Sequence, residues 1–335
     1  MTAAARVGDV VTHYRTRAAL SHPVFCGLDR AHLGGLIEEL AVPWLAQRES
    51  TLRERRGGER KRAVGAGPDH QLVFTARVLV TVVYMRLQLP HAALAELYGV
   101  TRPTVTRAIH EIRPLLAARG FAVPDCPGIR LRTLADVFAY AQAEGIDLRI
   151  DGTETQVRRP RAGRAGRKAF VSGKKKQNTA KTTTIADSSG RLLWSGADRP
   201  GRIHDQTAMR TEGIAEQLRL HPDVKAEVDE GCRGLANDYP DQVSAPPKQP
   251  KDDAPLGERY AWREERRRQS SSRICVEHTI AEEKKWRPLQ RYLGRREYYA
   301  ETHAAIAGLV SDRAARRPTR RRTGAELVPV WTATS

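Results

Sequence analysis

Residues 148–157 read LRIDGTETQV, and this stretch decides what kind of fold the chain can form. Apolar Leu148 and Ile150 alternate with polar residues, which is the period-two pattern of a half-buried strand. An Asp-Gly pair follows, and such pairs usually form turns. The pattern therefore predicts a strand that ends at Asp151 and a turn at Gly152. It leaves open whether Asp151 serves the turn or presents an acid at the end of the strand.

A second strand with the same ending is predicted at residues 224–229. Val224 and Val228 lie on its apolar face, Asp229 ends it, and Gly231 follows. In open sheets, ligands gather beyond the ends of strands. Two carboxylates brought together there would repel each other unless a cation lay between them. Oxygen ligands without His or Cys nearby suit Mg²⁺ or Mn²⁺, so the pair predicts a metal site, although either Asp alone is also a common turn residue.

A third acid is offered by the helix predicted over RICVEHTIAEEKKW, residues 273–286. Arg273, Glu277 and Lys284 share one face of this helix, because they are spaced by four and seven residues. We expect Glu277 to be a metal ligand, and Arg273 and Lys284 to hold phosphate groups beside it. The alternative is an ordinary solvated face with ion pairs.

The charge of the chain points to a polyanionic partner. Among its 335 residues, 57 Lys and Arg oppose 39 Asp and Glu, which gives a net charge of +18. A folded chain this basic most often binds nucleic acid, although a basic surface can also serve solubility alone. The low aromatic content of 6% argues against a protein that stacks the bases of single-stranded RNA.

Other sequence features exclude several classes of protein. No run of apolar residues is long enough for a membrane-spanning helix, and the N-terminus lacks the pattern of a secretory signal. The four cysteines are isolated, so neither a zinc site nor a disulfide framework is expected. We therefore expect a cytoplasmic protein without a membrane partner.

A helix-turn-helix is predicted in residues 70–122. The stretch PHAALAELYGVTRPTVTRAIHEIRPLL divides at Gly99, with small Ala95 before the turn and β-branched Val105 after it. Pro103 suits the first turn of the second helix, and Thr101 is a plausible N-cap. A helical hairpin inside a core would share these apolar positions. The DNA-facing residues expected on the second helix are Arg102, Thr104, Thr106, Arg107 and His110.

A basic segment follows the first predicted acid. Residues 155–186 contain no Asp or Glu. Lys and Arg side chains in this segment would follow a DNA backbone, with an affinity that falls as salt rises. A flexible basic loop without a partner is the alternative. The cations expected to contact DNA are Arg158, Arg159, Lys174, Lys175 and Lys176.

The whole chain divides into four predicted regions. The fold class is α/β, with an all-α N-terminal part that precedes a mixed sheet flanked by helices. The regions are a helical N-terminal segment with a basic linker (1–69), the helix-turn-helix (70–122), the sheet domain (140–310) and a basic, disordered tail (311–335).

Four motifs in this order resemble the DDE transposases of bacterial insertion sequences. They are DGTETQVRRP, SGKKKQNTAKTTTIADSSGRLLWSGADRPGRIHD, VDEGCRGL and VEHTIAEEKKW. The closest group is the insertion-sequence-five type, whose catalytic domain also occurs in Harbinger-like elements. The resemblance implies a ribonuclease-H-like domain in which two Asp and one Glu hold two Mg²⁺ (or Mn²⁺) ions.

The family pattern transfers to this chain residue by residue. It implies that Asp151, Asp229 and Glu277 are the metal ligands, and that Arg273 and Lys284 complete the signature around the Glu. The Tyr of that signature is Ser270 here, and the aromatic residue often found after the second Asp is Cys232. Asp205, in RIHDQ, is a rival to Asp229 that we rank lower because it lies at no predicted strand end.

The resemblance implies a transposase that binds inverted-repeat DNA ends and performs metal-dependent strand cleavage and strand transfer. We expect its partner to be double-stranded DNA, both as element ends and as target. We also expect the protein to act as a homodimer on DNA and to be associated with the nucleoid. Two alternatives stay open: a non-catalytic, transposase-derived DNA-binding regulator, and a metal-dependent nuclease of the same fold.

Overall fold

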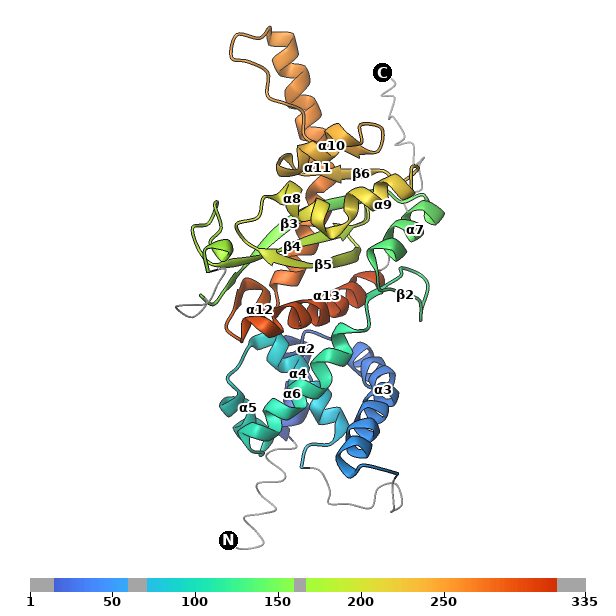
Figure 1. The fold of residues 1–335 in the computed structure, drawn as a ribbon, viewed down its shortest axis with the longest axis vertical. Helices are drawn as coiled ribbons and strands as arrows, with labels where there is room; N and C mark the ends of the chain where they lie inside the picture. Colours follow the sequence, from blue (N-terminus) through green and yellow to red (C-terminus); the bar gives the residue numbers. More distant parts are fainter. Residues whose placement is uncertain (1–14, 60–70, 160–166, 318–335) are drawn as a thin grey trace, which may run out of the picture.

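The computed structural model describes residues 15–59, 71–159 and 167–317. Figure 1 shows two parts: a bundle of N-terminal helices and, above it, a mixed sheet with helices around it. No helix in the described ranges is long and apolar enough to cross a membrane.

The N-terminal bundle is dominated by the long helix α3 (Arg30–Arg56). It begins at Asp29, whose carboxylate accepts a hydrogen bond from the backbone N–H of His32 at 2.7 Å, and it ends at Gly57 with φ of 67°. α3 therefore extends into the region expected to form the basic linker, as far as Arg56. Arg and Glu are good helix formers even without an apolar stripe. The rest of that linker, from residue 60, lies outside the described residues.

The helix-turn-helix forms where the sequence predicts it. Ala95 and Val105 are buried, and Gly99 makes the turn with φ of 63°. Thr101 is the N-cap residue of the second helix, as expected, although its side chain makes no capping hydrogen bond. The helices of this part are α2 (Pro23–Cys26), α4 (Phe74–Leu87), α5 (His91–Tyr98) and α6 (Arg102–Ala117).

The second part is built on one mixed sheet with the order β5-β4-β3-β6-β7, and β8 also pairs with β3. β4 runs antiparallel to both β3 and β5, whereas β6 and β8 run parallel to β3, and β7 runs parallel to β6. This is the strand order of ribonuclease-H-like domains, so the expected fold class is confirmed. The strands are β3 (Leu148–Val157), β4 (Thr179–Ala186), β5 (Leu192–Pro200), β6 (Ala226–Val228), β7 (Val243–Ser244) and β8 (Arg291–Tyr292).

The turn predicted at Gly152 is wrong. β3 continues through Gly152, which pairs with Thr183, and reaches Val157. The antiparallel pairing with β4 extends to Gln156, and this unbroken ladder outweighs the local turn preference of the Asp-Gly pair. Asp151 therefore lies within a central strand.

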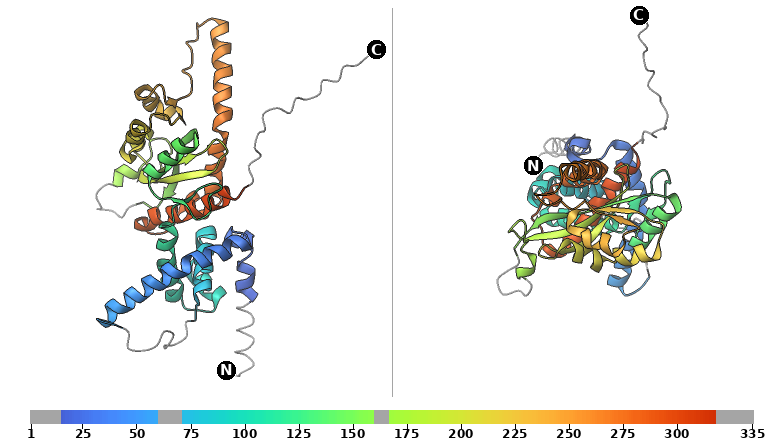
Figure 2. Two further views of the ribbon diagram at one scale, coloured as in Figure 1. Left: turned by 90° about the vertical axis from the view of Figure 1, so that its right-hand side faces the viewer. Right: turned by 90° about the horizontal axis from the view of Figure 1, so that it is seen from above.

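Helices cover the sheet and extend beyond it (Figures 1 and 2). Gly213, with φ of 97°, separates two short helices, α8 and α9. A small ladder of β1 (Phe121–Ala122) and β2 (Arg130–Leu131) precedes the sheet. The helices are α7 (Leu134–Glu144), η1 (Arg167–Phe170), α8 (Asp205–Glu212), α9 (Ile214–Leu220), η2 (Glu230–Cys232), α10 (Arg233–Asp238), α11 (Leu256–Lys284), α12 (Arg287–Gln290), η3 (Arg296–Tyr298) and α13 (Tyr299–Ala315).

The last helix, α13, joins the two parts of the molecule. It packs on β5 and on α6, and its residues up to Ala314 are largely buried. α13 continues past the boundary expected at residue 310 and ends at Ala315, with polar Ser311 and Asp312 buried in its last turns. Residues 318–335 of the expected tail lie outside the described residues.

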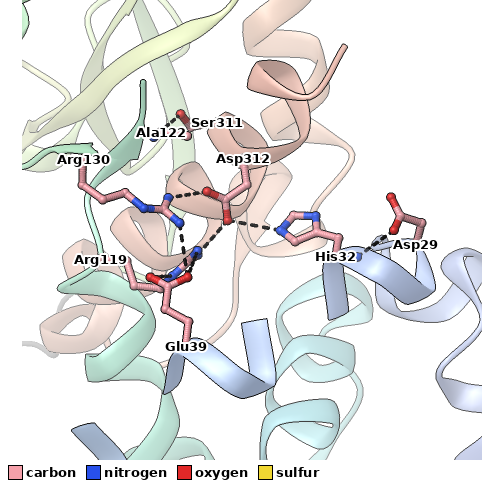
Figure 3. A network of polar contacts seen from close by, with 8 residues as sticks. All are labelled: Asp29, His32, Glu39, Arg119, Ala122, Arg130, Ser311 and Asp312. Carbon is pink, nitrogen blue, oxygen red and sulfur yellow. Dashed lines mark hydrogen bonds and ion pairs between the residues drawn. The ribbon is translucent and has the colours of Figure 1, made fainter. Parts of the chain in front are cut away.

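A buried polar network at Asp312 connects α13 to the N-terminal bundle (Figure 3). Asp312 pairs with Arg119 at 2.8 Å, with His32 of α3 at 3.1 Å, and with Arg130 of β2. Glu39 of α3 pairs with Arg119 and Arg130 from the other side. Burial alone would raise the pKa of Asp312, but the His32 hydrogen bond and the two arginines hold it well below its usual range.

Candidate active site

The two aspartates predicted from strand patterns are neighbours in the structure. β3 and β6 are parallel, and Ile150 is aligned with Val228. The next residue of each strand is therefore Asp151 on β3 and Asp229 at the end of β6, where it starts η2. The pattern of alternation located both acids correctly, although it did not show that β3 continues beyond Asp151.

Arg273 of α11 bridges these two carboxylates. Its Nη1 lies 2.7 Å from Asp229 Oδ1, and its Nη2 lies 3.4 Å from Asp151 Oδ2. The Nε of Arg273 is buried and has no hydrogen-bond partner in the described part of the chain. The guanidinium therefore supplies positive charge between the acids and keeps one unused donor beside them.

Contacts along the sheet set the position of Arg273. Ser272, the residue before it, donates a hydrogen bond to the carboxylate of Glu227 on β6. The Nε of Arg149 on β3 lies 3.2 Å from the same carboxylate. Further along α11, Thr279 donates a hydrogen bond to the carbonyl of Gly190 at 3.0 Å. These contacts hold α11 against β6 and against the turn between β4 and β5, which places Arg273 beside both acids.

Burial changes the protonation of Asp151. Desolvation raises its pKa to about 6, and the charges of Asp229 and Glu277 add to the rise. Arg273 and a 2.8 Å hydrogen bond from the N–H of Gly152 act in the opposite direction. A carboxylate with these surroundings is stabilised by any additional cation placed beside it.

Glu277 lies near the aspartates but does not join them. It is exposed on α11 one turn after Arg273, and its negative charge contributes to the raised pKa of Asp151. Over the described ranges, no three His, Cys, Asp or Glu side chains form a group that could hold a metal ion. Asp151 and Asp229 thus form a two-acid site bridged by Arg273, with Glu277 at its margin.

Lys284, the second predicted phosphate-binding residue, lies at the end of α11. It is half-buried, and burial lowers its pKa. The next influence on that pKa is the charge of Lys175, and Asp151 and Glu154 act in the opposite direction. Lys284 therefore shares the electrostatic surroundings of Asp151, as the common helical face with Arg273 predicts.

Asp205, which the sequence ranked lower, also reaches the site. A Cβ added to Gly231 would lie 2.9 Å from Asp205 Oδ2, and one added to Gly152 would lie 3.4 Å from Asp205 Oδ1. The Asp205 carboxylate therefore lies against Gly152, the residue after Asp151, and against Gly231, two residues after Asp229. Lys181 of β4 pairs with it at 2.7 Å. No periodic pattern marks Asp205, because its place depends on how α8 begins over the sheet.

The donors fit a hard divalent cation by their chemistry. Asp151, Asp229 and Glu277 offer only oxygen atoms, which suits Mg²⁺ or Mn²⁺. Cys232 offers a sulfur near the acids, but burial raises the pKa of its thiol to about 12, with Asp205 the largest charge acting on it. This thiol stays protonated at neutral pH and is a poor ligand.

The predicted DNA-binding residues are mostly exposed. Arg102 and Arg107 of α6 face solvent, whereas Thr104 and Thr106 are half-buried. Thr106 also hydrogen-bonds to His91 at 2.8 Å, and the ring of His110 packs against that of Tyr298 at 4.9 Å. His110 thus lies at the junction with the sheet domain. The cations beyond β3 are exposed; they are Arg158, Arg159, Lys174, Lys175 and Lys176.

The strand order and the neighbouring acids define a ribonuclease-H-like domain behind a helix-turn-helix. Residues 150–311 match the model of the DDE superfamily endonuclease, and residues 70–122 match the model of the helix-turn-helix of DDE superfamily endonuclease. One match thus covers the sheet domain and the other covers the helix-turn-helix, and both are to domains of DDE superfamily endonucleases. The finer assignment to the insertion-sequence-five type or Harbinger-like group stays a prediction.

Comparisons with individual proteins add little. No curated protein matches the chain. The solved Mos1 transposase paired-end complex with left transposon end is 10% identical, over 77% of this chain and 85% of that chain, with a TM-score of 0.18. The Mos1 mariner paired end complex with Mn is 11% identical, over 79% and 97%, also with a TM-score of 0.18. Likenesses at this level carry no argument about the present chain.

Proposed function

We propose that the chain is a transposase that binds the inverted-repeat ends of its element and catalyses DNA strand cleavage and strand transfer. The observation that carries this proposal is the placement of Asp151 and Asp229 at one level of neighbouring parallel strands, with Arg273 between them. The helix-turn-helix and the net charge of +18 support DNA as the substrate. A homodimer would allow two DNA ends to be handled together.

We assign the acids to divalent metal ions. Asp151, Asp229 and Glu277 would hold Mg²⁺ or Mn²⁺, two ions in all, and the bound metal would supply Lewis-acid activation of the attacking oxygen and stabilisation of the leaving oxygen. The raised pKa of Asp151 is consistent with a carboxylate that gains from a nearby cation.

The cationic side chains act on the DNA itself. Arg273, whose guanidinium lies between the two acids, would neutralise charge that builds up on the phosphate during cleavage. Lys284 would hold a second phosphate oxygen as a point charge. Lys174, Lys175 and Lys176, which are exposed, would follow the backbone of the same DNA.

Strand cleavage and joining tests this function. Duplexes that carry the inverted repeats flanking the gene are incubated with the full chain and Mn²⁺. The wild type is expected to nick and join them, and Asp229→Ala is expected to lose at least a hundredfold in rate. Full activity in Asp229→Ala would refute the assignment of the acids.

One observation favours a second candidate, a non-catalytic DNA-binding regulator. Arg273 already balances the two aspartates, and the described residues hold no completed three-acid cluster. A regulator would bind the same duplexes with a strong salt dependence and would leave them intact with Mg²⁺ or Mn²⁺. The cleavage assay therefore separates the two candidates.

A further inference from the structure

Helix α11 extends well beyond the sheet that carries the candidate acids. Its C-terminal half packs on β3 and β4, whereas its N-terminal turns project away from the domain (orange, Figures 1 and 2). Trp262, in the projecting half, donates a hydrogen bond to the carbonyl of Pro247 in the segment that leads into the helix. We call residues 256–270 the arm.

The arm continues the helical face on which Arg273 and Glu277 lie. Steps of three or four residues keep side chains on one face of a helix. Such steps connect a single row from the tip of the arm to the site. The row is Arg259, Arg263, Arg266, Ser270, Arg273, Glu277, Ala281 and Lys284.

Charges on the arm are separated by face. Glu258, Glu264 and Glu265 lie off the face of the row, because none of them is three, four or seven residues away from Arg263 or from Arg266. Among the described residues, Arg263 and Arg266 make no ion pair. They stack instead over Tyr260 and Trp262, at 5.8 and 5.4 Å, which leaves their N–H groups available.

We propose that this arginine row on the arm binds the phosphate backbone of the duplex that enters the acid site. The proposal rests on the proposed function for the identity of the DNA. A polyanion matches a row of unpaired arginines that leads to a site for phosphate chemistry. From Arg259 to Glu277 the helix rises about 27 Å, which is the length of about eight base pairs.

The test compares DNA binding by two charge reversals on the same arm. The row variant is Arg263→Glu with Arg266→Glu, and the control is Arg268→Glu, which is exposed on the opposite face. Binding is measured in EDTA, so that no cleavage is needed. Two duplexes are used: one ends at the inverted repeat, and the other continues about twelve base pairs past it.

The wild type and Arg268→Glu are expected to bind the extended duplex about tenfold more tightly than the short one. The row variant should bind both equally, and the slope of its log affinity against log salt should fall by about two. Three results would overturn the proposal: an extended-duplex preference kept by the row variant, an equal loss in Arg268→Glu, or a change in self-association with DNA affinity unaltered. If the wild type prefers the extended duplex but does not cleave DNA in Mn²⁺, DNA binding by the arm would be supported and the proposed transposase activity would be refuted.

Discussion

Asp151 and Asp229 follow aligned residues of two parallel strands, because Ile150 of β3 pairs with Val228 of β6. Arg273 closes the pair from α11, 2.7 Å from Asp229 and 3.4 Å from Asp151. The backbone hydrogen bonds of the central sheet therefore fix the spacing of the acids, and no loop has to order for them to meet. A rigid pair of carboxylates is what a metal-assisted phosphoryl transfer requires.

The two glycines beside the acids should differ in their tolerance of a methyl group. In Gly231→Ala the new Cβ would lie 2.9 Å from Asp205 Oδ2, so the carboxylate must move, whereas in Gly152→Ala the closest approach is 3.4 Å. We expect Gly231→Ala to lower the cleavage rate about tenfold or more and Gly152→Ala to lower it less. Rates are measured on the inverted-repeat duplex, with unfolding curves as a control for stability. Equal rates in the two variants would show that Asp205 is not held at the site.

Removal of the Asp312 charge should weaken the contact between the helical bundle and the sheet domain and lower the free energy of unfolding. Asp312→Asn removes the buried carboxylate partner of Arg119 and Arg130, which keep only the more exposed Glu39, and loss of one member of a buried pair costs about 3–5 kcal/mol. Glu39→Gln, at a more exposed position, should cost about 1 kcal/mol or less. Urea unfolding measures both.

The effect of Asp312→Asn should also depend on pH. The pKa of Asp312 is lower in the folded chain than in the unfolded chain, so its contribution is present above the unfolded value and is lost as pH falls. The stability difference between the wild type and Asp312→Asn should therefore shrink as pH falls below about 4. A difference that is constant from pH 7 to pH 3 would contradict the charge network.

A buried acid below the sheet should make the chain less stable as pH rises. Glu283 accepts a hydrogen bond from Thr184 at 3.3 Å, and burial raises its pKa to about 7. Between about pH 5 and pH 7 the folded chain holds a proton that the unfolded chain releases, so the contribution of Glu283 falls with pH. His303, whose pKa burial lowers to about 4, changes stability in the opposite direction over much of this range.

The contribution of Glu283 is therefore measured as the difference in unfolding free energy between Glu283→Gln and the wild type. Glu283→Gln keeps the hydrogen-bonding shape and removes the titration. Its stability relative to the wild type should rise from pH 5 to pH 7, with a slope of roughly 1 kcal/mol per pH unit, in urea unfolding at matched ionic strength. A flat difference would mean that Glu283 keeps the same charge in both states across this range.

Local patterns predicted the site where it depends on periodicity. Alternation placed Asp151 in a strand and Asp229 directly after one, and helical spacing put Arg273 and Glu277 on one helix. The prediction of a turn at Gly152 was wrong because its partner strand, β4, begins many residues later and imposes a continuous ladder. The same limit applies to Asp205, whose neighbours Gly152, Lys181 and Gly231 meet it only after the sheet and α8 have packed.

Mn²⁺ binding, followed by electron paramagnetic resonance, tests the central claim most directly. The claim is that Asp151 and Asp229, with Glu277, hold the metal, and that Asp205 lies beside them without binding it. Asp151→Asn and Asp229→Asn should each weaken Mn²⁺ binding at least tenfold, and Asp205→Asn should retain affinity within about threefold of the wild type. Loss of Mn²⁺ binding in Asp205→Asn together with unchanged binding in Asp229→Asn would contradict the account and move the metal site to Asp205.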